Sequence, residues 1–384
     1  MTTPFQGDVA PGWERVGEVF RALLVDGADV GAGLCVFHHG ERVVDLTGGW
    51  RDIDRVAPYD DATLQVLFST SKGVVALAVA LCVQRGLLTY DEPVGLFWPE
   101  FGVAGKEAIT VGEVMSHQAG LYCLDAPASL EEALDWEAMT RRLASTTRQA
   151  TAGHGYHALT WGWLAGELVR RVDGRDIGTF VAEELAAPVG GECWFGLPER
   201  FENRVAPLNT GWERRETSTS GGGSPDSLLS RVLSVNGALA VKGGFNRRDV
   251  RAAAIPAANG VSNARTVASI YSASFTETQT PAGSVKLLDD EIRQLATRRM
   301  TPLGERDDVL RIETSFAMGF MTPSAIVPFT GESSYGHPGA GGSLGFADPS
   351  RGIAFAYVMN RMGDMLIGDD RAVRLAAAMY SVIG

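Results

Sequence analysis

Hydrophobic and polar positions at the two ends of the chain follow helix and strand spacing. Apolar residues recur at helical spacing in residues 13–25, which predicts an amphipathic helix. Residues 31–50 form two β-rich runs around a short turn, which predicts a hairpin. Residues 342–360 repeat this strand–turn–strand pattern, and a closing helix is expected to begin at Asp369 and Asp370, whose charges suit a helix N-terminus. The two ends therefore predict one antiparallel sheet with covering helices.

The middle of the chain has a different pattern. Between residues 91 and 299, short helical stretches alternate with glycine and proline. We therefore predict an α/β (α+β) fold in which residues 1–90 and 300–384 form an α/β lobe with the antiparallel sheet. Residues 91–299 are predicted to form an inserted, mostly helical lobe, with the active site in the cleft between the lobes. Residues 214–227 are rich in glycine and serine and are expected to be mobile.

One apolar run, LFSTSKGVVALAVALCVQRG (residues 67–86), carries a lysine although lysine is rare in this chain. Lys72 is one of only four lysines, and it lies three residues after Ser69. Apolar residues surround the helical axis on all sides, which predicts a buried helix that ends at Gly86. Ser69 could simply cap this helix, and Lys72 could extend its amine to water. However, a first helical turn favours acids over bases. Because residues i and i+3 face each other, the pattern also fits a lysine base that activates a serine nucleophile.

Two later segments could complete such a site. Tyr156 directly precedes a strong helical pattern, and a tyrosine beside a cationic lysine is expected to have a lowered pKa and to relay a proton. A core tyrosine with one hydrogen bond is the alternative. The segment SYGHPGAGGSLGF (residues 334–346) has glycines that let the backbone approach a ligand closely. Its amides could form an oxyanion hole together with the amide of Ser69.

Taken together, the ordered motifs resemble a known family. Ser69-x-x-Lys72, Tyr156 in GYHALTWGWLAGELVRR, and the box beginning at His337 are similar to serine β-lactamases and penicillin-binding proteins. The stretches LTYDEPVGLFWPEF, ITVGEVMSHQAGL and GHPGAGGSLGFADPSRGIAFAYVMNRM extend this likeness over nearly the whole chain. Together they most resemble the class C β-lactamase-like hydrolases known as family VIII carboxylesterases. The resemblance implies that Ser69 is the acylated nucleophile, Lys72 its base partner and Tyr156 a second general acid or base.

The resemblance also implies substrate-binding residues, with two departures from the β-lactamases. Ala340, after Gly339, would supply the second oxyanion amide. The box that starts at His337 falls where class C β-lactamases carry Lys-Thr-Gly, so His337 takes the place of the lysine. In the tyrosine motif, His157 follows Tyr156, and no asparagine stands two positions after the tyrosine. Both histidines are counted as candidate substrate contacts. Because the missing lysine and asparagine help the β-lactamases to bind and turn over the lactam, we expect a short-chain acyl ester as substrate and poor β-lactam hydrolysis.

Three classes of function are compatible with the sequence. The leading hypothesis is a serine carboxylesterase that cleaves small, short-chain acyl esters through an acyl-enzyme. The second is an acyltransferase or a peptide- or amide-processing enzyme of the penicillin-binding-protein type, with weak β-lactamase activity. The third is a non-catalytic binding protein, against which the intact set of Ser69, Lys72 and Tyr156 argues.

Other residues that look reactive are interpreted as structural. GGSLG (residues 341–345) matches the G-x-S-x-G pattern of α/β-hydrolases, with Ser343 as nucleophile. That pattern requires a following helix, whereas the residues after Ser343 predict a strand, a turn and a strand. His117 is expected to fix a loop. His154 and His157 flank Tyr156, and they either contact substrate or pack the loop.

Composition narrows the set of partners. The chain has 384 residues with a formal net charge of −12, which disfavours nucleic acid and anionic membranes. We find no run of about eighteen apolar residues and no signal-peptide pattern, so we expect no membrane partner and a cytoplasmic location. Four isolated cysteines and the spacing of the six histidines predict reduced thiols, no metal site and no cofactor. A small-molecule ester is the expected partner, and the sequence leaves open whether the chain forms a homo-oligomer.

Overall fold

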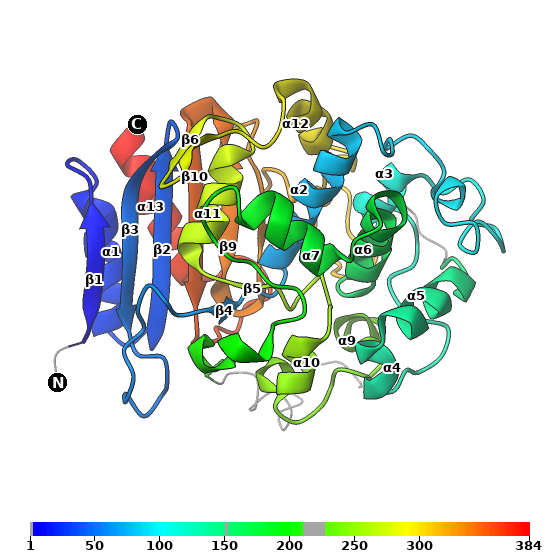
Figure 1. Ribbon diagram of the computed structural model, residues 1–384, viewed down its shortest axis with the longest axis horizontal. Helices are drawn as coiled ribbons and strands as arrows, with labels where there is room; N and C mark the ends of the chain where they lie inside the picture. Colours follow the sequence, from blue (N-terminus) through cyan, green and yellow to red (C-terminus); the bar gives the residue numbers. More distant parts are fainter. Residues whose placement is uncertain (1–2, 150–152, 210–226) are drawn as a thin grey trace.

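The main β-sheet is built from the two ends of the chain, as the sequence predicts (Figure 1). The computed structural model describes residues 3–149, 153–209 and 227–384. Six antiparallel strands follow the order β1-β3-β2-β10-β9-β8. The strands are β1 (Phe5–Val9), β2 (Gly31–His38), β3 (Glu41–Gly49), β8 (Tyr335–Pro338), β9 (Leu344–Asp348) and β10 (Ile353–Met359). Two small two-stranded pairs lie outside this sheet: β4 (Gln65–Val66) with β5 (Val261–Ser262), and β6 (Thr278–Thr280) with β7 (Gly283–Val285).

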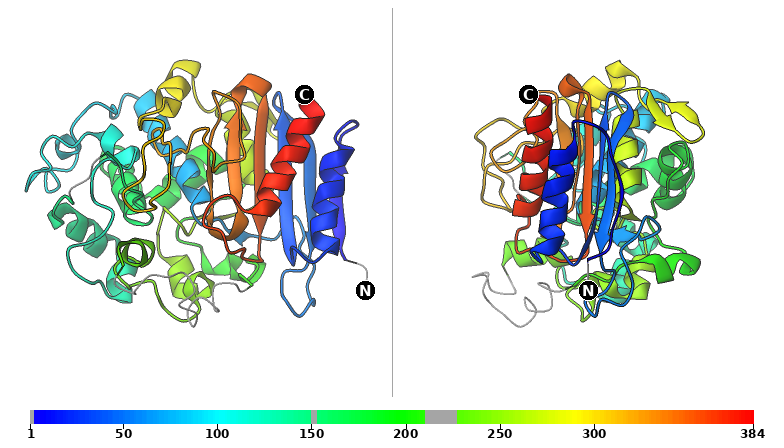
Figure 2. Two further views of the ribbon diagram at one scale, coloured as in Figure 1. Left: turned by 180° about the vertical axis from the view of Figure 1, so that it is seen from behind. Right: turned by 90° about the vertical axis from the view of Figure 1, so that its left-hand side faces the viewer.

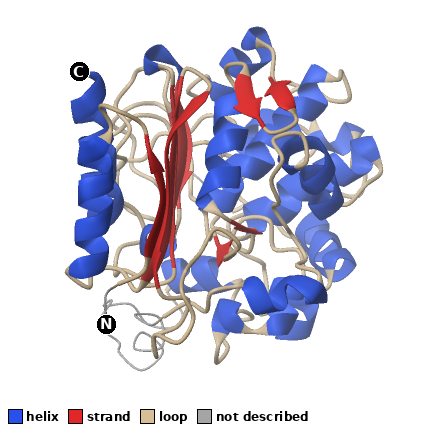
Figure 3. Cartoon of the chain, turned by 60° about the vertical axis from the view of Figure 1, so that its left-hand side comes forward, coloured by secondary structure: helices blue, strands red, loops and turns tan. Residues whose placement is uncertain are grey.

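Helices cover both faces of the main sheet. The terminal helices α1 (Glu14–Val25) and α13 (Asp370–Ile383) pack against each other on one face (Figure 2). α1 buries residues at the predicted helical spacing, and α13 begins directly after its cap residue Asp369, as predicted. On the other face, α11 (Ala264–Ala273) packs against β2, β9 and β10, and the remaining helices lie on the same side of the sheet (Figure 3).

Except for α2, the remaining helices lie between residues 91 and 299, where the sequence predicts helices. They are α2 (Thr70–Gln84), α3 (Val111–Met115), α4 (Leu130–Leu134), α5 (Trp136–Ser145), α6 (Thr160–Asp173), α7 (Ile177–Val181), α9 (Leu228–Ser234), α10 (Arg248–Ala252) and α12 (Asp290–Thr297). The described residues also contain the short helical turns η1 (Val94–Leu96), η2 (Ala182–Ala186), η3 (Glu199–Arg204), η4 (Gly244–Asn246), η5 (Ala340–Gly342) and η6 (Pro349–Arg351).

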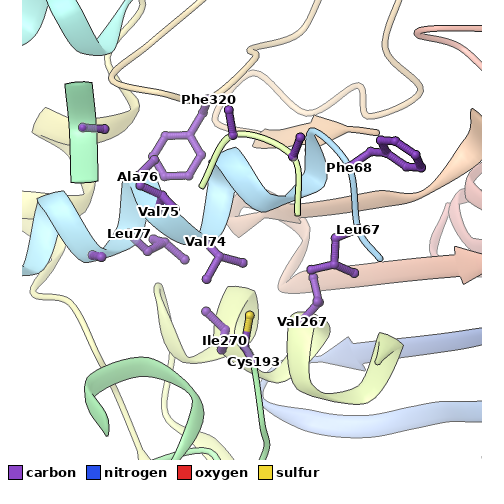
Figure 4. Packing of buried hydrophobic residues seen from close by; sticks show 14 of the residues in the cluster. Leu67, Phe68, Val74, Val75, Ala76, Leu77, Cys193, Val267, Ile270 and Phe320 are labelled. Atoms are coloured by element: carbon purple, nitrogen blue, oxygen red, sulfur yellow. The ribbon is translucent and has the colours of Figure 1, made fainter. Parts of the chain in front are cut away.

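The buried helix predicted after Ser69 is α2, and it occupies the centre of the molecule. Every residue from position 70 to position 83 is buried. α2 contacts α6, α7 and α12 as well as strands β8 and β9. Its apolar side chains pack on residues from distant segments, including Val267, Ile270 and Phe320 (Figure 4). The apolar residues all around this helix thus allow it to join the sheet to the helical part.

Two features of the organisation differ from the sequence prediction. The pattern gave no strand at β1, because β1 is an edge strand whose three central residues are exposed. α11 falls within the predicted helical lobe, yet it packs on the sheet. The division into lobes at residues 91 and 299, with a cleft between them, stays a prediction. Of residues 214–227, which the sequence predicts to be mobile, only Ser227 lies within the described residues.

Candidate active site

Ser69 directly precedes α2, and its side chain is free of the capping role that the sequence left open. The Ser69 hydroxyl makes no cap hydrogen bond to the helix. The residue is half-buried, whereas its neighbours on both sides are buried. Phe68 before it has a φ of 47°, a left-handed conformation that is unfavourable for a bulky side chain. Such conformations persist where the surrounding structure enforces them, which is common at functional sites. Ser69 is thus the N-cap residue by position, but its hydroxyl does not cap the helix.

Lys72 points inward to Ser69 and does not reach water. Its side chain is 0% exposed. The amine nitrogen Nζ lies 3.1 Å from the Oγ of Ser69, 2.7 Å from the carbonyl oxygen of Ala158 and 3.1 Å from that of Ala257. No acid is among these three partners. The alternative of an amine that extends to solvent is therefore excluded.

The partners of Lys72 match a neutral amine that can accept a proton. Burial lowers the pKa of Lys72 well below its ordinary value. A neutral amine has two N–H groups and one lone pair. The carbonyl oxygens of Ala158 and Ala257 can take both N–H groups, which leaves the lone pair for the hydroxyl proton of Ser69. Ala158 stands two positions after Tyr156, where β-lactamases carry an asparagine side chain, and here the backbone carbonyl contacts the lysine.

Tyr156 contacts Ser69 from the other side. Its hydroxyl donates to the Oγ of Ser69 at 2.8 Å, and the Nζ of Lys72 lies 4.9 Å from the centre of the tyrosine ring. Tyr156 is 2% exposed. Burial raises the pKa of Tyr156, while the hydrogen bond with Ser69 opposes that rise. The expected lowering of this pKa by a cationic lysine was therefore wrong, because the lysine is buried without an acid and its own pKa is lowered.

The segment that carries His337, Gly339 and Ala340 lies at the edge strand β8 and in the turn that follows it. The backbone N–H of Gly339 donates to the carbonyl oxygen of Ser343 at 2.7 Å, which closes the turn. Ala340 is half-buried, like Ser69. Among the described residues, no backbone carbonyl accepts a hydrogen bond from the N–H of Ser69 or from that of Ala340. Both amides are therefore available to an oxyanion.

His337 is buried and carries no charge. It is 0% exposed, and its Nδ1–H donates to the carbonyl oxygen of Pro338 at 2.7 Å. Burial is the main cause that lowers the pKa of His337 to about 3. Its ring lies 6.1 Å from that of Tyr156, centre to centre. His337 thus stays close to the tyrosine, but it is neutral near pH 7.

His157 is held by the backbone on both sides of its ring. Its Nε2 accepts from the N–H of Leu121 at 2.8 Å, so the proton is on Nδ1, which lies 2.6 Å from the carbonyl oxygen of Gly155. The backbone N–H of His157 in turn donates to the Nδ1 of His117 at 3.1 Å. These bonds leave His157 no free polar atom for the substrate contact that the sequence suggested. Both His117 and His157 fix the loop that places Tyr156.

Ser343, the serine of the G-x-S-x-G pattern, has a structural position. It is 1% exposed, and strand β9 follows it in place of a helix. Its Oγ donates to the carbonyl oxygen of Leu67 at 2.7 Å and accepts from the Oγ1 of Thr70 at 3.1 Å. Ser343 thus joins the turn after β8 to the start of α2. The prediction that it is not a nucleophile agrees with this environment.

Sequence reasoning missed two buried charged residues near the site. Arg371 donates from Nη2 to the carbonyl oxygen of Gly341 at 2.5 Å, and it also binds Asp29 and Asp369. It thereby fixes the turn that contains Ala340. Asp307 accepts from the backbone N–H of Tyr156 at 3.1 Å. Gly341 is 30 positions from Arg371, and Tyr156 is 151 positions from Asp307, so no local motif could indicate these two contacts.

The described residues contain neither a candidate metal site nor a candidate membrane-spanning helix. Among them, no group of three or more His, Cys, Asp and Glu side chains could hold a metal ion. All four cysteines are free thiols and buried, as predicted. In the part of the chain that the structure describes, no helix has the length and apolar character needed to span a bilayer. The cytoplasmic location and the question of a homo-oligomer stay as the sequence left them.

Known proteins share this sequence and this architecture. The Beta-lactamase family model matches residues 16–378. The esterase/beta-lactamase LipL of Mycobacterium tuberculosis is 33% identical, and the match covers 95% of this chain and 85% of LipL. The crystal structure of a family VIII carboxylesterase matches with a TM-score of 0.87 and a sequence identity of 32%, and the match covers 99% of this chain and 100% of that chain. The structure of EstA from Arthrobacter nitroguajacolicus matches with a TM-score of 0.88 and a sequence identity of 32%, and the match covers 100% of this chain and 99% of that chain. The resemblance inferred from the motifs is confirmed, and the chain belongs to the Beta-lactamase family.

Proposed function

We propose that the protein is a serine carboxylesterase that cleaves small acyl esters through an acyl-enzyme on Ser69. One observation carries this proposal: the Oγ of Ser69 lies 3.1 Å from a buried amine and 2.8 Å from a buried phenol. The relatives named esterase and family VIII carboxylesterase support the same reaction class. A binding protein would have no need to bury a lysine without an acid.

In the acylation step, the two buried groups have opposite roles. The Oγ of Ser69 attacks the ester carbonyl carbon while Lys72 takes the hydroxyl proton on its lone pair. The carbonyl oxygen becomes an oxyanion, which the backbone N–H groups of Ser69 and Ala340 stabilise. The bond to the alcohol then breaks, and Tyr156 gives its proton to the departing alkoxide. The Lys72 ammonium returns its proton to Tyr156, which restores both groups.

Deacylation follows the same proton path with a new acceptor. Water attacks the acyl carbon and loses a proton to the neutral Lys72, while the Oγ of Ser69 leaves and takes a proton from Tyr156. The Lys72 ammonium then returns a proton to Tyr156. Nothing in this sequence of steps requires the acceptor to be water. An alcohol or amine that occupies the same position would give acyl transfer, so this alternative rests on the same residues.

The site favours esters over β-lactams. A β-lactam carries a carboxylate, and His337 stands where the β-lactamases have a lysine. His337 is buried and neutral, so it offers no charge-assisted hydrogen bond, and such bonds are about twice as strong as neutral ones. Ala158 also lacks the polar side chain of the asparagine that it replaces. We therefore expect weak β-lactam hydrolysis at most.

A substrate series tests this proposal directly. The kcat/KM of p-nitrophenyl esters from acetate to decanoate should be measured beside that of nitrocefin, each with and without an added alcohol or amine. We expect rapid hydrolysis of the short esters and slow or undetectable turnover of nitrocefin. Nitrocefin turnover that equals that of the butyrate ester would replace this assignment with that of a β-lactamase. Dominant formation of the transfer product would favour an acyltransferase.

A further inference from the structure

A buried carboxylate lies behind Tyr156, on the segment between α12 and β8. Asp307 is 0% exposed. Its Oδ1 accepts hydrogen bonds from the backbone N–H groups of Tyr156 at 3.1 Å, Val309 at 2.8 Å and Leu310 at 2.8 Å. The bond to Tyr156 joins residues that are 151 positions apart. It therefore attaches the loop of the tyrosine to a distant segment of the chain.

The charge of Asp307 has little compensation. Within the described residues, no lysine or arginine lies within ion-pair distance of it, and the Nε2 of His154 lies 3.9 Å from its Oδ2. Thr314 donates from Oγ1 to the same oxygen at 3.4 Å. Glu305 lies 3.5 Å from the Nδ1 of His154, and Asp308 donates its backbone N–H to the carbonyl oxygen of His154. An asparagine could accept the same three backbone bonds without the cost of burying a charge. The negative charge itself therefore needs an explanation.

Other titratable groups face Tyr156 from its remaining sides. Lys72 lies 4.9 Å from the ring centre. The rings of His117 and His337 lie 5.1 Å and 6.1 Å away, centre to centre. Burial lowers the pKa values of both histidines, so they are neutral near pH 7. Asp307 is then the buried carboxylate that faces the tyrosine, and it adds to the effect of burial on the tyrosine pKa.

We propose that Asp307 is a positioning residue for Tyr156: it fixes the tyrosine backbone, and its negative charge keeps the hydroxyl protonated until the leaving group takes the proton. This inference rests on the proposed esterase mechanism. Burial is the main cause of the raised pKa of Tyr156, the hydrogen bond with Ser69 acts against it, and Asp307 adds to the rise. A nearby negative charge disfavours the tyrosinate, so the sign agrees with the role.

This role separates the acid from the base in the site. Lys72 and Tyr156 both contact the Oγ of Ser69, so either could in principle take its proton. Burial favours the neutral lysine, and Asp307 disfavours the ionised tyrosine. Environments that push two pKa values apart assign the base and the acid. Asp307 thus directs the serine proton to Lys72 and reserves the tyrosine proton for the leaving group.

A double-mutant cycle tests the coupling between Asp307 and Tyr156. The variants are Asp307→Asn, Tyr156→Phe and the pair, with kcat for a short-chain ester normalised to the active fraction by phosphonate titration. We expect Asp307→Asn to lower kcat about tenfold in the wild type and by less than about twofold when Tyr156→Phe is present, a coupling of the size seen between contacting groups. Asp348→Asn is the matched control. Asp348 is also buried, and it accepts from the hydroxyls of Tyr380 and Ser350. Its effect should be equal in both backgrounds.

A pH profile adds a measurement that a purely structural role would not change. Loss of the negative charge lowers the pKa of Tyr156, so the alkaline decline of kcat/KM should begin at a lower pH in Asp307→Asn than in the wild type. Asp307→Glu, which keeps the charge but moves it, should lower kcat and keep the alkaline limit of the wild type. It also provides a second cycle with Tyr156→Phe if Asp307→Asn does not fold. Equal effects of the Asp307 variants with and without Tyr156 would overturn the inference. The esterase proposal would still stand in that case, provided that the phosphonate labels Ser69.

Discussion

Two serines of this chain lie in catalytic sequence patterns, and their surroundings differ in one decisive respect. Ser69 is half-buried, and its Oγ contacts an amine and a phenol. Ser343 is buried, and its Oγ contacts a backbone carbonyl and the hydroxyl of Thr70. A carbonyl oxygen and a neutral hydroxyl cannot take up a proton near pH 7. Lys72 can, because burial lowers its pKa.

The comparison shows that a nucleophile is defined by the group that accepts its proton. S-x-x-K places the base one helical turn from the serine, so the motif itself contains the chemistry. G-x-S-x-G contains no base and depends on a strand–turn–helix context to expose its serine. Here β9 follows Ser343, and that context is missing. The hydroxyl serves instead to join the turn after β8 to the start of α2.

The largest expected effect comes from removing the Ser69 hydroxyl. Ser69→Ala should lower kcat by roughly 10⁴-fold or more, as expected when the nucleophile of a coupled set is lost. Mass spectrometry after treatment with a serine-directed phosphonate should place the adduct on Ser69. An adduct on Ser343 would reverse the comparison between the two serines and indicate an α/β-hydrolase mechanism.

The next effect comes from the two proton-transfer groups. Lys72→Met and Tyr156→Phe should each lower kcat by roughly 10²-fold or more, the scale for positioned general acid–base catalysis. Methionine is chosen because Lys72 is fully buried, and a shorter side chain would leave a cavity. Circular dichroism and thermal unfolding serve as folding controls. If a folded Tyr156→Phe variant kept the wild-type kcat, the tyrosine would contribute only to packing and not to proton transfer.

The parts of the site that follow local spacing could be predicted from the sequence. The contact between Ser69 and Lys72 depends on three residues of helix, and the hairpins depend on alternation around short turns. The apolar residues all around α2 also predicted its burial. These features need no knowledge of the distant chain. This explains why the antiparallel sheet and the central helix agree with the prediction.

The parts that depend on long-range contacts could not be predicted from the sequence. Asp307 and Arg371 reach partners that are distant in sequence, and no pattern connects them. The pKa of Tyr156 was predicted in the wrong direction, because burial outweighs the charge expected on Lys72. His157 looked accessible beside Tyr156, but the backbone of Leu121 and Gly155 binds both of its ring nitrogens.

The lowered pKa of Lys72 predicts a pH dependence of both activity and stability. The proposed mechanism uses the neutral amine of Lys72, so kcat/KM should fall as the pH drops through the pKa of Lys72. The folded state holds the amine neutral at pH values where the unfolded chain protonates it, so the unfolded chain binds more protons. The unfolding free energy of the wild type should therefore rise with pH, relative to that of Lys72→Met, up to the ordinary lysine pKa of about 10.4. Urea unfolding of both proteins between about pH 7 and pH 10 measures this difference. A constant difference would show that the amine stays charged in the folded protein.

The smallest expected effect on activity is that of Ser343→Ala, and it sharpens the comparison of the two serines. The substitution removes the hydroxyl that joins Leu67 to the turn after β8, so the buried hydroxyl of Thr70 loses its acceptor. The carbonyl oxygen of Leu67 keeps the 3.3 Å bond from the backbone N–H of Thr70. An unsatisfied buried group costs about 1–3 kcal/mol, so thermal unfolding should occur at a lower temperature. The proton path through Lys72 and Tyr156 is unchanged, and only the turn that carries Ala340 can shift. We therefore expect kcat to fall by less than about tenfold, which is less than the loss expected when an oxyanion donor is removed. Labelling by the phosphonate should remain on Ser69 at full stoichiometry. A loss of kcat as large as that of Ser69→Ala, in a variant that is folded and still labelled, would mean that the turn held by Ser343 contributes as much to the reaction as the nucleophile itself.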